Sequence, residues 1–217
     1  MSHVWSAAFV LSVAATAGHT LEQNRVEPRH VPNKPDVNSP APAVVRVLGV
    51  LSRRAPALTP DMRERVAAAI VDESNRAGFD PIFVLAIIDV ESDFQPEARS
   101  IVGAQGLMQI MPRTREYLRE REGFTVSPGD DDSTDPVMSV RLGVRYLGWL
   151  KERYGTLDLA LVAYNAGPGR MLEAQAAGEL ERYRGYVTQV FFEYHRLRRE
   201  EGLLAGRGFA LRPRERS

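Results

Sequence analysis

The sequence predicts a mainly α fold, and three observations support this. Helix starts recur along the chain as a capping side chain followed by proline, at Thr59-Pro60-Asp61, Asp80-Pro81 and Asp135-Pro136. The segments that follow carry apolar residues at helical spacing. No segment alternates apolar and polar residues between hairpin turns. We therefore expect helices, with at most a small irregular β element.

Composition fits one globular domain with some additional chain, because 217 residues with 44% hydrophobic and 26% charged content are ordinary for a soluble protein. The 28 basic and 28 acidic residues balance, so no overall field favours nucleic acid or an anionic membrane. The chain has no cysteine. This excludes a disulfide framework, a thiolate metal site, a cysteine nucleophile and the acylated cysteine of a bacterial lipoprotein.

The N-terminus resembles an export signal. Val4 to Ala17 is apolar and rich in small residues, and Ala15-Thr16-Ala17 is an A-x-A cleavage pattern. The stretch is too short to span a bilayer comfortably. We expect a signal peptide over residues 1–17 and export to the periplasm or cell envelope. The signal is atypical because no Lys or Arg precedes it, and the alternative is an unstructured apolar N-terminus.

The rest of the chain divides into three parts. Residues 18–55 are expected to form a proline-rich linker and an N-terminal arm, in which Val44 to Leu51 is either a first helix or a packed arm. Residues 56–200 form the compact domain, and residues 201–217 form a basic tail. We expect the arginine-rich end to be solvated from Arg196 onwards.

Within the compact domain the helix signals are strong. The second helix, PIFVLAIIDVE, is apolar nearly all round, so it should be buried, with Glu91 at its C-terminal end. The other expected helices are 60–77 with Gly78 as its stop, 112–122, a long amphipathic helix after Asp135, LDLALVAYNA, and about 183–199.

Glu91 is the first candidate for chemistry. The negative end of the helix dipole and the apolar helix both disfavour a carboxylate there, which raises its pKa. A carboxylic acid that stays protonated near neutral pH can protonate a glycosidic oxygen. Taken alone, a glutamate that ends a helix is more often only solvated.

The loop after Glu91 carries neutral groups suited to a sugar. Ser100, Gln105 and Gln109 can hydrogen-bond hydroxyl and N-acetyl groups, while Gly103 and Gly106 allow tight turns and close approach to a ligand. The alternative is structural: the glycines are turn residues and the apolar members pack in the core, namely Met108, Ile110 and Met111.

Two ordered blocks are similar to the soluble lytic transglycosylases, enzymes that cleave the glycan strands of bacterial peptidoglycan. The first is ESDFQPEARSIVGAQGLMQIMPRT, beginning at Glu91. The second is AYNAGPG, beginning at Ala163 and preceded by RLGVRYLGWL. The resemblance covers roughly residues 60–195. It implies a single catalytic domain with the lysozyme-like α+β fold.

Carried over by position, the resemblance implies Glu91 as the catalytic acid and base. Ser100, Gln109 and Met111 would line the cleft beside it. Tyr164 and Asn165 would close the cleft from the opposite side; their structural alternatives are a core aromatic and a helix-terminating residue.

A third block of the family, Glu-Thr-x-x-Tyr-Val, is only partly present. Tyr186-Val187 fits it, and Tyr186 is therefore a further substrate-binding candidate. The expected glutamate position holds Arg182, with Glu181 displaced by one residue, so no role is assigned to Glu181.

Most glycosidases use two carboxylates. Asp89 is expected on the buried helix, on a different face from Glu91, and Asp93 is expected as a surface charge of the loop. The resemblance instead implies one glutamate, assistance from the substrate's own N-acetyl group, and attack by the C6 hydroxyl. The product is a 1,6-anhydroMurNAc end, formed without added water or a cofactor.

A metal site could be sought in Asp130, Asp131, Asp132 and Asp135. The EF-hand pattern requires glycine at its sixth position, where Asp135 stands, so we expect a solvated acidic loop and no metal.

Two alternative functions remain open. One is a muramidase that uses water on the same fold, and the other is a non-catalytic peptidoglycan-binding assembly protein. The expected partner is the peptidoglycan glycan strand. Because domains of this family also serve secretion, pilus and phage systems, the resemblance leaves open whether the partner is only the wall or also cell-envelope secretion or pilus machinery.

Overall fold

The computed structural model describes residues 40–124 and 134–210. The helices of these two ranges are α1 (Pro40–Arg54), α2 (Pro60–Ala77), α3 (Pro81–Ser92), α4 (Pro112–Glu122), α5 (Pro136–Tyr154), α6 (Leu157–Ala166), α7 (Pro168–Ala177), a short 3₁₀ helix η1 (Leu180–Tyr183), and α8 (Arg184–Ala210). This is the mainly α class that the sequence predicts. None of the described helices is both long and apolar enough to cross a membrane.

The predicted helix starts are confirmed by their caps. Thr59 accepts a hydrogen bond from the Met62 amide at 3.2 Å, and Asp80 accepts one from the Ile82 amide at 2.9 Å. Asp135 likewise caps α5 through the Met138 amide at 2.8 Å. Each side chain satisfies an amide that the first helical turn leaves without a partner.

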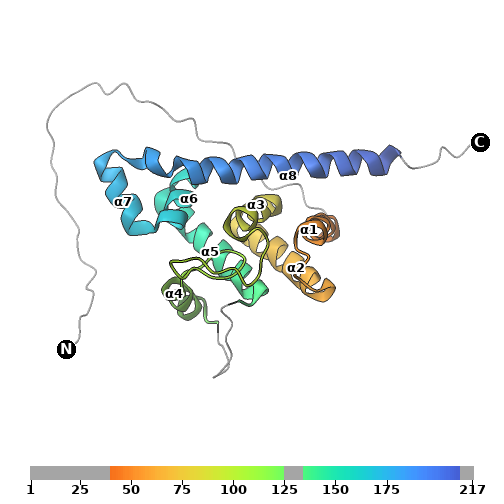
Figure 1. Cartoon of the computed structure of the whole chain (residues 1–217), viewed down its shortest axis with the longest axis horizontal. Helices are drawn as coiled ribbons and strands as arrows, with labels where there is room; N and C mark the ends of the chain where they lie inside the picture. Colours follow the sequence, from red (N-terminus) through yellow and green to blue (C-terminus); the bar gives the residue numbers. More distant parts are fainter. Residues whose placement is uncertain (1–39, 125–133, 211–217) are drawn as a thin grey trace, which may run out of the picture.

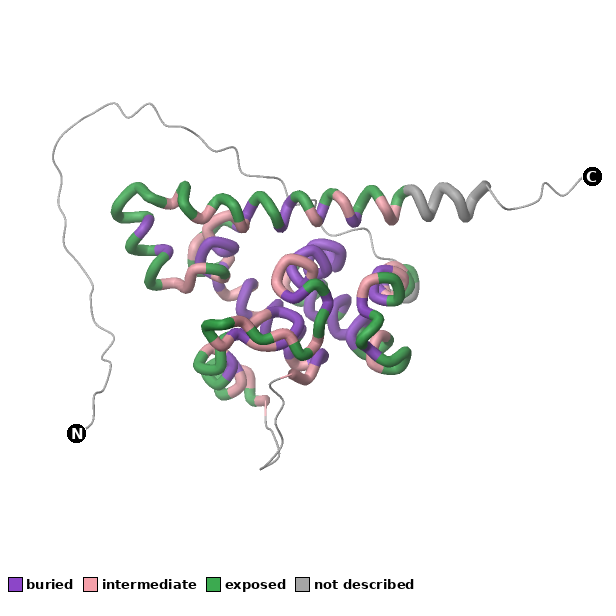
Figure 2. Tube along the Cα trace, in the orientation of Figure 1, coloured by how far each residue is buried: buried purple, intermediate pink, exposed green. Residues whose placement is uncertain are grey.

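Helix α3 is the buried centre of the domain. Its residues from Pro81 to Ile88 are all buried, as its apolar sequence predicts. The long helix α8 lies across it, while α5 packs on α2 and α6 (Figure 1). The buried segments of these helices face one another in Figure 2. Since α3 is held on several sides, the residues at its C-terminal end are presented on a rigid support.

The N-terminal arm is a helix. Helix α1 begins at Pro40, slightly inside the predicted linker, and prolines are tolerated there because the first turn needs no amide donor. Val47, Val50 and Leu51 are buried in the core, so the helical alternative for 44–51 is confirmed. Residues 1–17, the predicted signal peptide, lie outside the described residues.

The prediction of a solvated tail from Arg196 is wrong. Helix α8 continues through this region, Leu197 is fully buried, and Arg196 hydrogen-bonds Asp89 of α3. The arginine-rich composition suggested a tail, but Leu197 continues the apolar stripe of the helix. Helix α7, which sequence patterns did not indicate, begins at Pro168.

Candidate active site

Glu91 lies in the last turn of α3. Asp93 ends the helix in the left-handed conformation (φ 48°), and its amide donates to the Asp89 carbonyl at 2.9 Å. The predicted position of Glu91 at the helix C-terminus is therefore confirmed. The carboxyl group lies at the negative end of the helix dipole, where a charge of the same sign is disfavoured.

Two tyrosines from other helices lie near Glu91. Tyr186 of α8 donates its hydroxyl to Glu91 Oε1 at 2.5 Å. Tyr164 of α6 lies close enough for the charge of Glu91 to raise its pKa, although burial is the larger cause. The Tyr164 hydroxyl donates to the Met108 carbonyl at 2.7 Å. Three distant segments of the chain therefore meet at this carboxyl group.

Burial raises the pKa of Glu91 from its ordinary value of 4.5 to about 7, and the hydrogen bond from Tyr186 opposes part of that rise. Removal from water disfavours the charged form, whereas a hydroxyl donor favours it. At neutral pH the group is therefore divided between acid and base forms. Such a group can donate a proton and later recover it.

The loop between α3 and α4 folds back onto the C-terminal end of α3 and carries the small β element. Isolated bridges pair Gln105 with Arg99 and with Ile110. Ser92 ties the loop to the helix, because its hydroxyl contacts the Leu107 carbonyl at 2.9 Å and the Ile88 carbonyl at 3.1 Å. The residue next to Glu91 thus fixes the position of the loop.

Gln109 shapes the same loop from within. It adopts the left-handed conformation (φ 46°), which is costly for a residue other than glycine and is found mainly where surrounding contacts enforce it. Its side-chain amide donates to the carbonyls of Ala98 at 3.0 Å and Gly106 at 2.9 Å. A loop-forming role is therefore established, and a contact with substrate stays a prediction.

Ser100 and Met111 lie at different parts of the loop. The Ser100 hydroxyl accepts a hydrogen bond from the Ala104 amide at 2.9 Å, which closes a tight turn. Met111 is 41% exposed, immediately before α4. It is therefore not a core residue. Met108 and Ile110 are buried, so among the apolar members of the loop the structural alternative holds for those two. Asn165, beside Tyr164, is exposed.

Helix α5 holds the loop in place through its contacts with Met108. The Ser139 hydroxyl accepts a hydrogen bond from the Met108 amide at 3.0 Å. One turn later, a Cβ on Gly143 would overlap the Met108 side chain. Sequence reasoning did not single out these two residues. An isolated glycine inside the helical segment RLGVRYLGWL is a signal of close approach that could have indicated Gly143.

The sequence model of the transglycosylase SLT domain matches residues 68–183, which is just over half of the chain. The chain belongs to this family. Its mainly α fold is the lysozyme-like fold of the family. The match ends before Tyr186, where the third sequence block is only partly present.

Curated relatives are longer chains that match this one over part of their length. The chain is 32% identical over 122 residues to the soluble lytic murein transglycosylase of Salmonella typhimurium, covering 50% of this chain and 19% of the relative. It is 30% identical over 172 residues to the membrane-bound lytic murein transglycosylase C of Actinobacillus pleuropneumoniae, covering 75% and 44%. The chain thus spans less than half the length of these relatives.

Solved structures of the family are similar in fold. The inactive glutamate-to-glutamine mutant of the lytic transglycosylase Slt of Pseudomonas aeruginosa matches with a TM-score of 0.53 and 26% identity, over 65% of this chain and 28% of that one. The 70-kDa soluble lytic transglycosylase in complex with bulgecin A matches with a TM-score of 0.52 and 28% identity, over 62% and 25%.

Asp89 and Asp93 are the aspartates nearest to Glu91 in the chain, and neither is available as a second catalytic carboxylate. Asp89 accepts hydrogen bonds from Arg54 at 2.6 Å and Arg196 at 2.7 Å. The Asp93 side chain is 78% exposed, as expected of a surface charge. Residues 130–132 lie outside the described residues, and Asp135 serves as a helix cap. The described residues contain no group of three side chains that could hold a metal ion.

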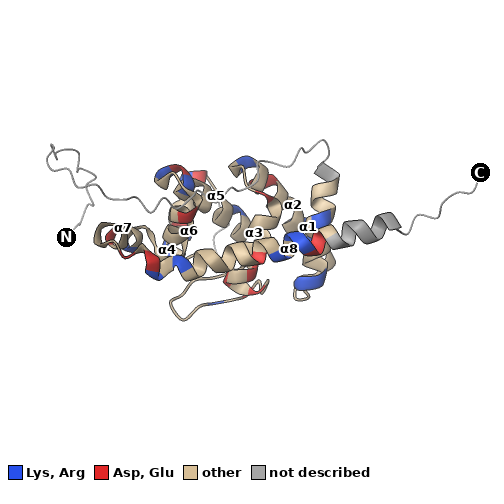
Figure 3. Cartoon of the chain, turned by 90° about the horizontal axis from the view of Figure 1, so that it is seen from above, with Lys and Arg blue, Asp and Glu red and all other residues tan. Residues whose placement is uncertain are grey.

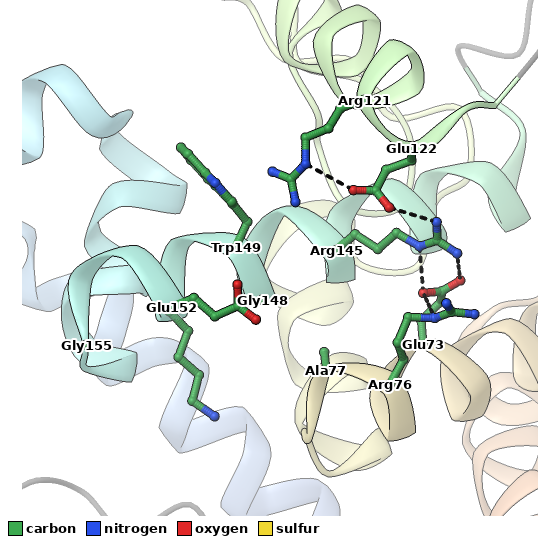
Figure 4. A pocket seen from close by; sticks show the side chains of 11 residues that line it. Glu73, Arg76, Ala77, Arg121, Glu122, Arg145, Gly148, Trp149, Glu152 and Gly155 are labelled. Atoms are coloured by element: carbon green, nitrogen blue, oxygen red, sulfur yellow. Dashed lines mark hydrogen bonds and ion pairs between the residues drawn. The ribbon is translucent and has the colours of Figure 1, made fainter. Parts of the chain in front are cut away.

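A pocket of about 410 Å³ lies between α2, α4 and α5 of the SLT domain (Figure 4), and Glu91 is not among the residues that line it. Ion pairs join five of its charged side chains, namely Glu73, Arg76, Arg121, Glu122 and Arg145. Arg145 binds both carboxylate oxygens of Glu73, at 2.8 and 2.9 Å, and contacts Glu122 at 3.1 Å. Arg121 approaches Glu122 at 3.2 Å. This network joins three helices, so its evident role is structural.

Proposed function

We propose that this chain is a peptidoglycan lytic transglycosylase in which Glu91 is the acid and base. The observation that carries the proposal is the half-buried carboxyl of Glu91, with a pKa raised to about 7 and a hydrogen bond from Tyr186. Membership of the SLT family and the names of the relatives, lytic murein transglycosylases, support the substrate class.

The proposed reaction begins with the acid form of Glu91, which donates its proton to the oxygen that links MurNAc to GlcNAc. The C1–oxygen bond of MurNAc breaks, and the N-acetyl oxygen of the same sugar stabilises the positive C1. The ionised Glu91 then removes a proton from the C6 hydroxyl, whose oxygen attacks C1. The products are a 1,6-anhydroMurNAc end and a new GlcNAc 4-hydroxyl, and no water is consumed.

One carboxyl group suffices for this route because it changes protonation state between the two steps. A pKa near the working pH is the value that serves both roles. The engagement of Asp89 by two arginines and the exposure of Asp93 support a single-carboxylate mechanism. In the Pseudomonas aeruginosa relative, one glutamate-to-glutamine change yields an inactive enzyme, which is consistent with such a dependence.

The loop and the second tyrosine complete the proposed site. We assign Ser100, Gln109 and Met111 to one wall of the glycan cleft, and Tyr164 and Asn165 to the other. Tyr164 supports this assignment through its bond to the Met108 carbonyl, which joins α6 to the loop. Export to the periplasm or cell envelope, where peptidoglycan lies, belongs to the same proposal.

The test is digestion of purified peptidoglycan by the full chain and by Glu91→Gln, with products identified by mass spectrometry. We expect 1,6-anhydroMurNAc ends from the wild type and none from the variant. Asp93→Asn is the matched control, because it removes an exposed carboxylate two residues away, and it should remain active. Reducing ends in place of anhydro ends would indicate a muramidase. Equal cleavage by wild type and Glu91→Gln would refute the role of Glu91.

A further inference from the structure

Asp89 is a buried carboxylate two residues before Glu91, and both of its oxygens are engaged. Arg54 of α1 donates to Oδ1 at 2.6 Å, and Arg196 of α8 donates to Oδ2 at 2.7 Å. The Asp89 side chain is only 8% exposed. A charge with so little exposure is costly unless it is paired. Moving either arginine away would leave the Asp89 carboxylate short of a partner, so both arginines are held in place. We refer to Arg54, Asp89 and Arg196 as the Asp89 cluster.

Arg54 contacts the chain on both sides of Glu91. Besides Asp89, it approaches Asp93 at 3.4 Å, and its guanidinium lies 5.3 Å from the centre of the buried Phe94 ring. Asp93 and Phe94 both have positive φ, at 48° and 59°. The last residue of α1 therefore supports the strained turn through which the chain leaves the proposed catalytic helix.

Arg196 fixes α8 at the same point. Its remaining donors contact Glu193 and Glu200 of its own helix, both at 2.5 Å. Figure 3 shows these charged turns beside α1, after a long uncharged stretch of α8. Tyr186 lies at the start of that stretch, ten residues and about 15 Å of helix before Arg196. The contacts of α8 with Asp89 and Glu91 thus reach the same end of α3.

Apolar packing alone does not set the register of α8. Its buried stripe, formed by Val187, Val190, Phe191, Tyr194 and Leu197, selects a face of the helix, but hydrophobic burial is not directional. Hydrogen bonds weaken steeply with distance and angle. Tyr194 anchors α8 at the other end of α3, where it donates to Asp80 at 2.9 Å. Apart from the Tyr186 hydroxyl itself, the Asp89 cluster is the polar contact of α8 with α3 that lies nearest in the chain to Glu91.

We propose that the Asp89 cluster positions the catalytic pair: by holding α1 and α8 on the end of α3, it keeps the Tyr186 hydroxyl on Glu91. Arg54 and Arg196 are then positioning residues of the proposed lytic transglycosylase reaction, on which this inference rests. Both lie outside residues 68–183, so the cluster joins two flanking helices to the SLT segment. Neither arginine touches the substrate in this proposal.

Different groups surround the two carboxyls. Tyr186 of α8 hydrogen-bonds Glu91, and Tyr164 of α6 lies near enough for the charge of Glu91 to raise its pKa. Burial raises the pKa of Asp89, Arg54 and Arg196 lower it, and the charges of Glu193 and Asp93 raise it. Loss of an arginine is therefore expected to act on Glu91 through Tyr186.

The experiment compares Arg196→Met and Arg54→Met with the control Arg199→Met in the full chain. Methionine keeps an unbranched apolar stem, and Arg199 is an exposed arginine of α8 three residues after Arg196. We measure kcat, KM and their pH dependence on a defined glycan, and titrate the Glu91 carboxyl carbon by NMR. Arg196→Met and Arg54→Met should lower kcat about tenfold to a hundredfold, as for one lost hydrogen bond to a charged group. KM should hardly change, and the Glu91 pKa should rise.

Further variants separate positioning from stability. Arg196→Lys retains a donor and should recover part of kcat. Tyr186→Phe combined with Arg196→Met should be no slower than Tyr186→Phe alone. Lower thermal stability with an unchanged Glu91 pKa and pH profile, or rate losses that multiply, would overturn the inference. If wild type formed no anhydro ends, the proposed function would fail, yet the NMR titrations would still decide whether the cluster positions Tyr186.

Discussion

Tyr186 and Glu91 are 95 residues apart in the chain, and the Tyr186 hydroxyl donates to Glu91 Oε1 at 2.5 Å. A hydroxyl donor favours the ionised carboxyl, so it opposes the rise in pKa that burial causes. The contact therefore helps keep the pKa of Glu91 near 7, where the acid and base forms are both populated.

Tyr186→Phe is the direct test of this contact. The pKa of Glu91 should rise, so the decline of kcat/KM on the alkaline side should move to higher pH. The rate should fall about tenfold to a hundredfold, because the carboxylate formed by proton donation loses a charge-assisted hydrogen bond. Tyr183→Phe is the control, since Tyr183 packs nearby on the core without a bond to Glu91. An unchanged pH profile in Tyr186→Phe would contradict the assignment.

Glu91→Gln should make the protein more stable at neutral pH. Because the folded pKa of Glu91 is about 7 against an ordinary 4.5, the unfolded chain releases this proton first, and stability falls as pH rises from 4.5 to 7. Glutamine avoids that cost, so the free energy of unfolding should increase by up to about 3 kcal/mol at pH 8.

Urea denaturation at pH 4 and pH 8 measures this difference. Below pH 4.5 both proteins carry a neutral group at position 91, so their stabilities should converge. Asp93→Asn, with its exposed carboxylate, should show no such gain. A constant difference between the two pH values would indicate that Glu91 does not titrate with a raised pKa.

The sequence predicted the elements well where local chemistry decides them. Pro60, Pro81 and Pro136, each preceded by a capping side chain, fixed helix starts, and the glutamate at the end of the apolar helix was found. The roles of Ser92 and Ser139 were missed because they depend on contacts with residues distant in the fold. Serine is common at many positions, so its type carries no signal of a bond to Leu107 or Met108.

The charged C-terminal region shows the same limit. Arginine-rich sequence suggested a solvated tail, yet Arg196 is ordered by a carboxylate that lies 107 residues earlier. Only the folded chain brings Asp89, Arg54 and Arg196 together. Ion pairs of this kind leave no periodic pattern, whereas the apolar stripe that includes Leu197 does.

The ion pair between Glu73 and Arg145 should matter for stability and not for chemistry. The Glu73 side chain is 4% exposed and that of Arg145 is 15% exposed. Glu73→Gln leaves the guanidinium without its main partner, which should cost about 3–5 kcal/mol of unfolding free energy. Glu179→Gln breaks an exposed pair and should cost less than about 1 kcal/mol. A small loss in Glu73→Gln, measured in urea, would mean that Glu122 alone suffices for Arg145.

Gly143→Ala should destabilise the site, since the added Cβ would overlap Met108. Overpacking of this kind typically costs about 1–3 kcal/mol, and displacement of Met108 would also weaken its amide bond to Ser139. The Met108 carbonyl accepts a hydrogen bond from the Tyr164 hydroxyl, so the proposed cleavage rate should fall as well.

Gly49→Ala is the matched control, because the nearest atom to its Cβ is the flexible end of Arg53 at 3.6 Å. In the middle of α1 this change should stabilise the helix by about 0.5–1 kcal/mol. Equal thermal stability and activity of the two variants would show that the loop can move away from α5 without cost.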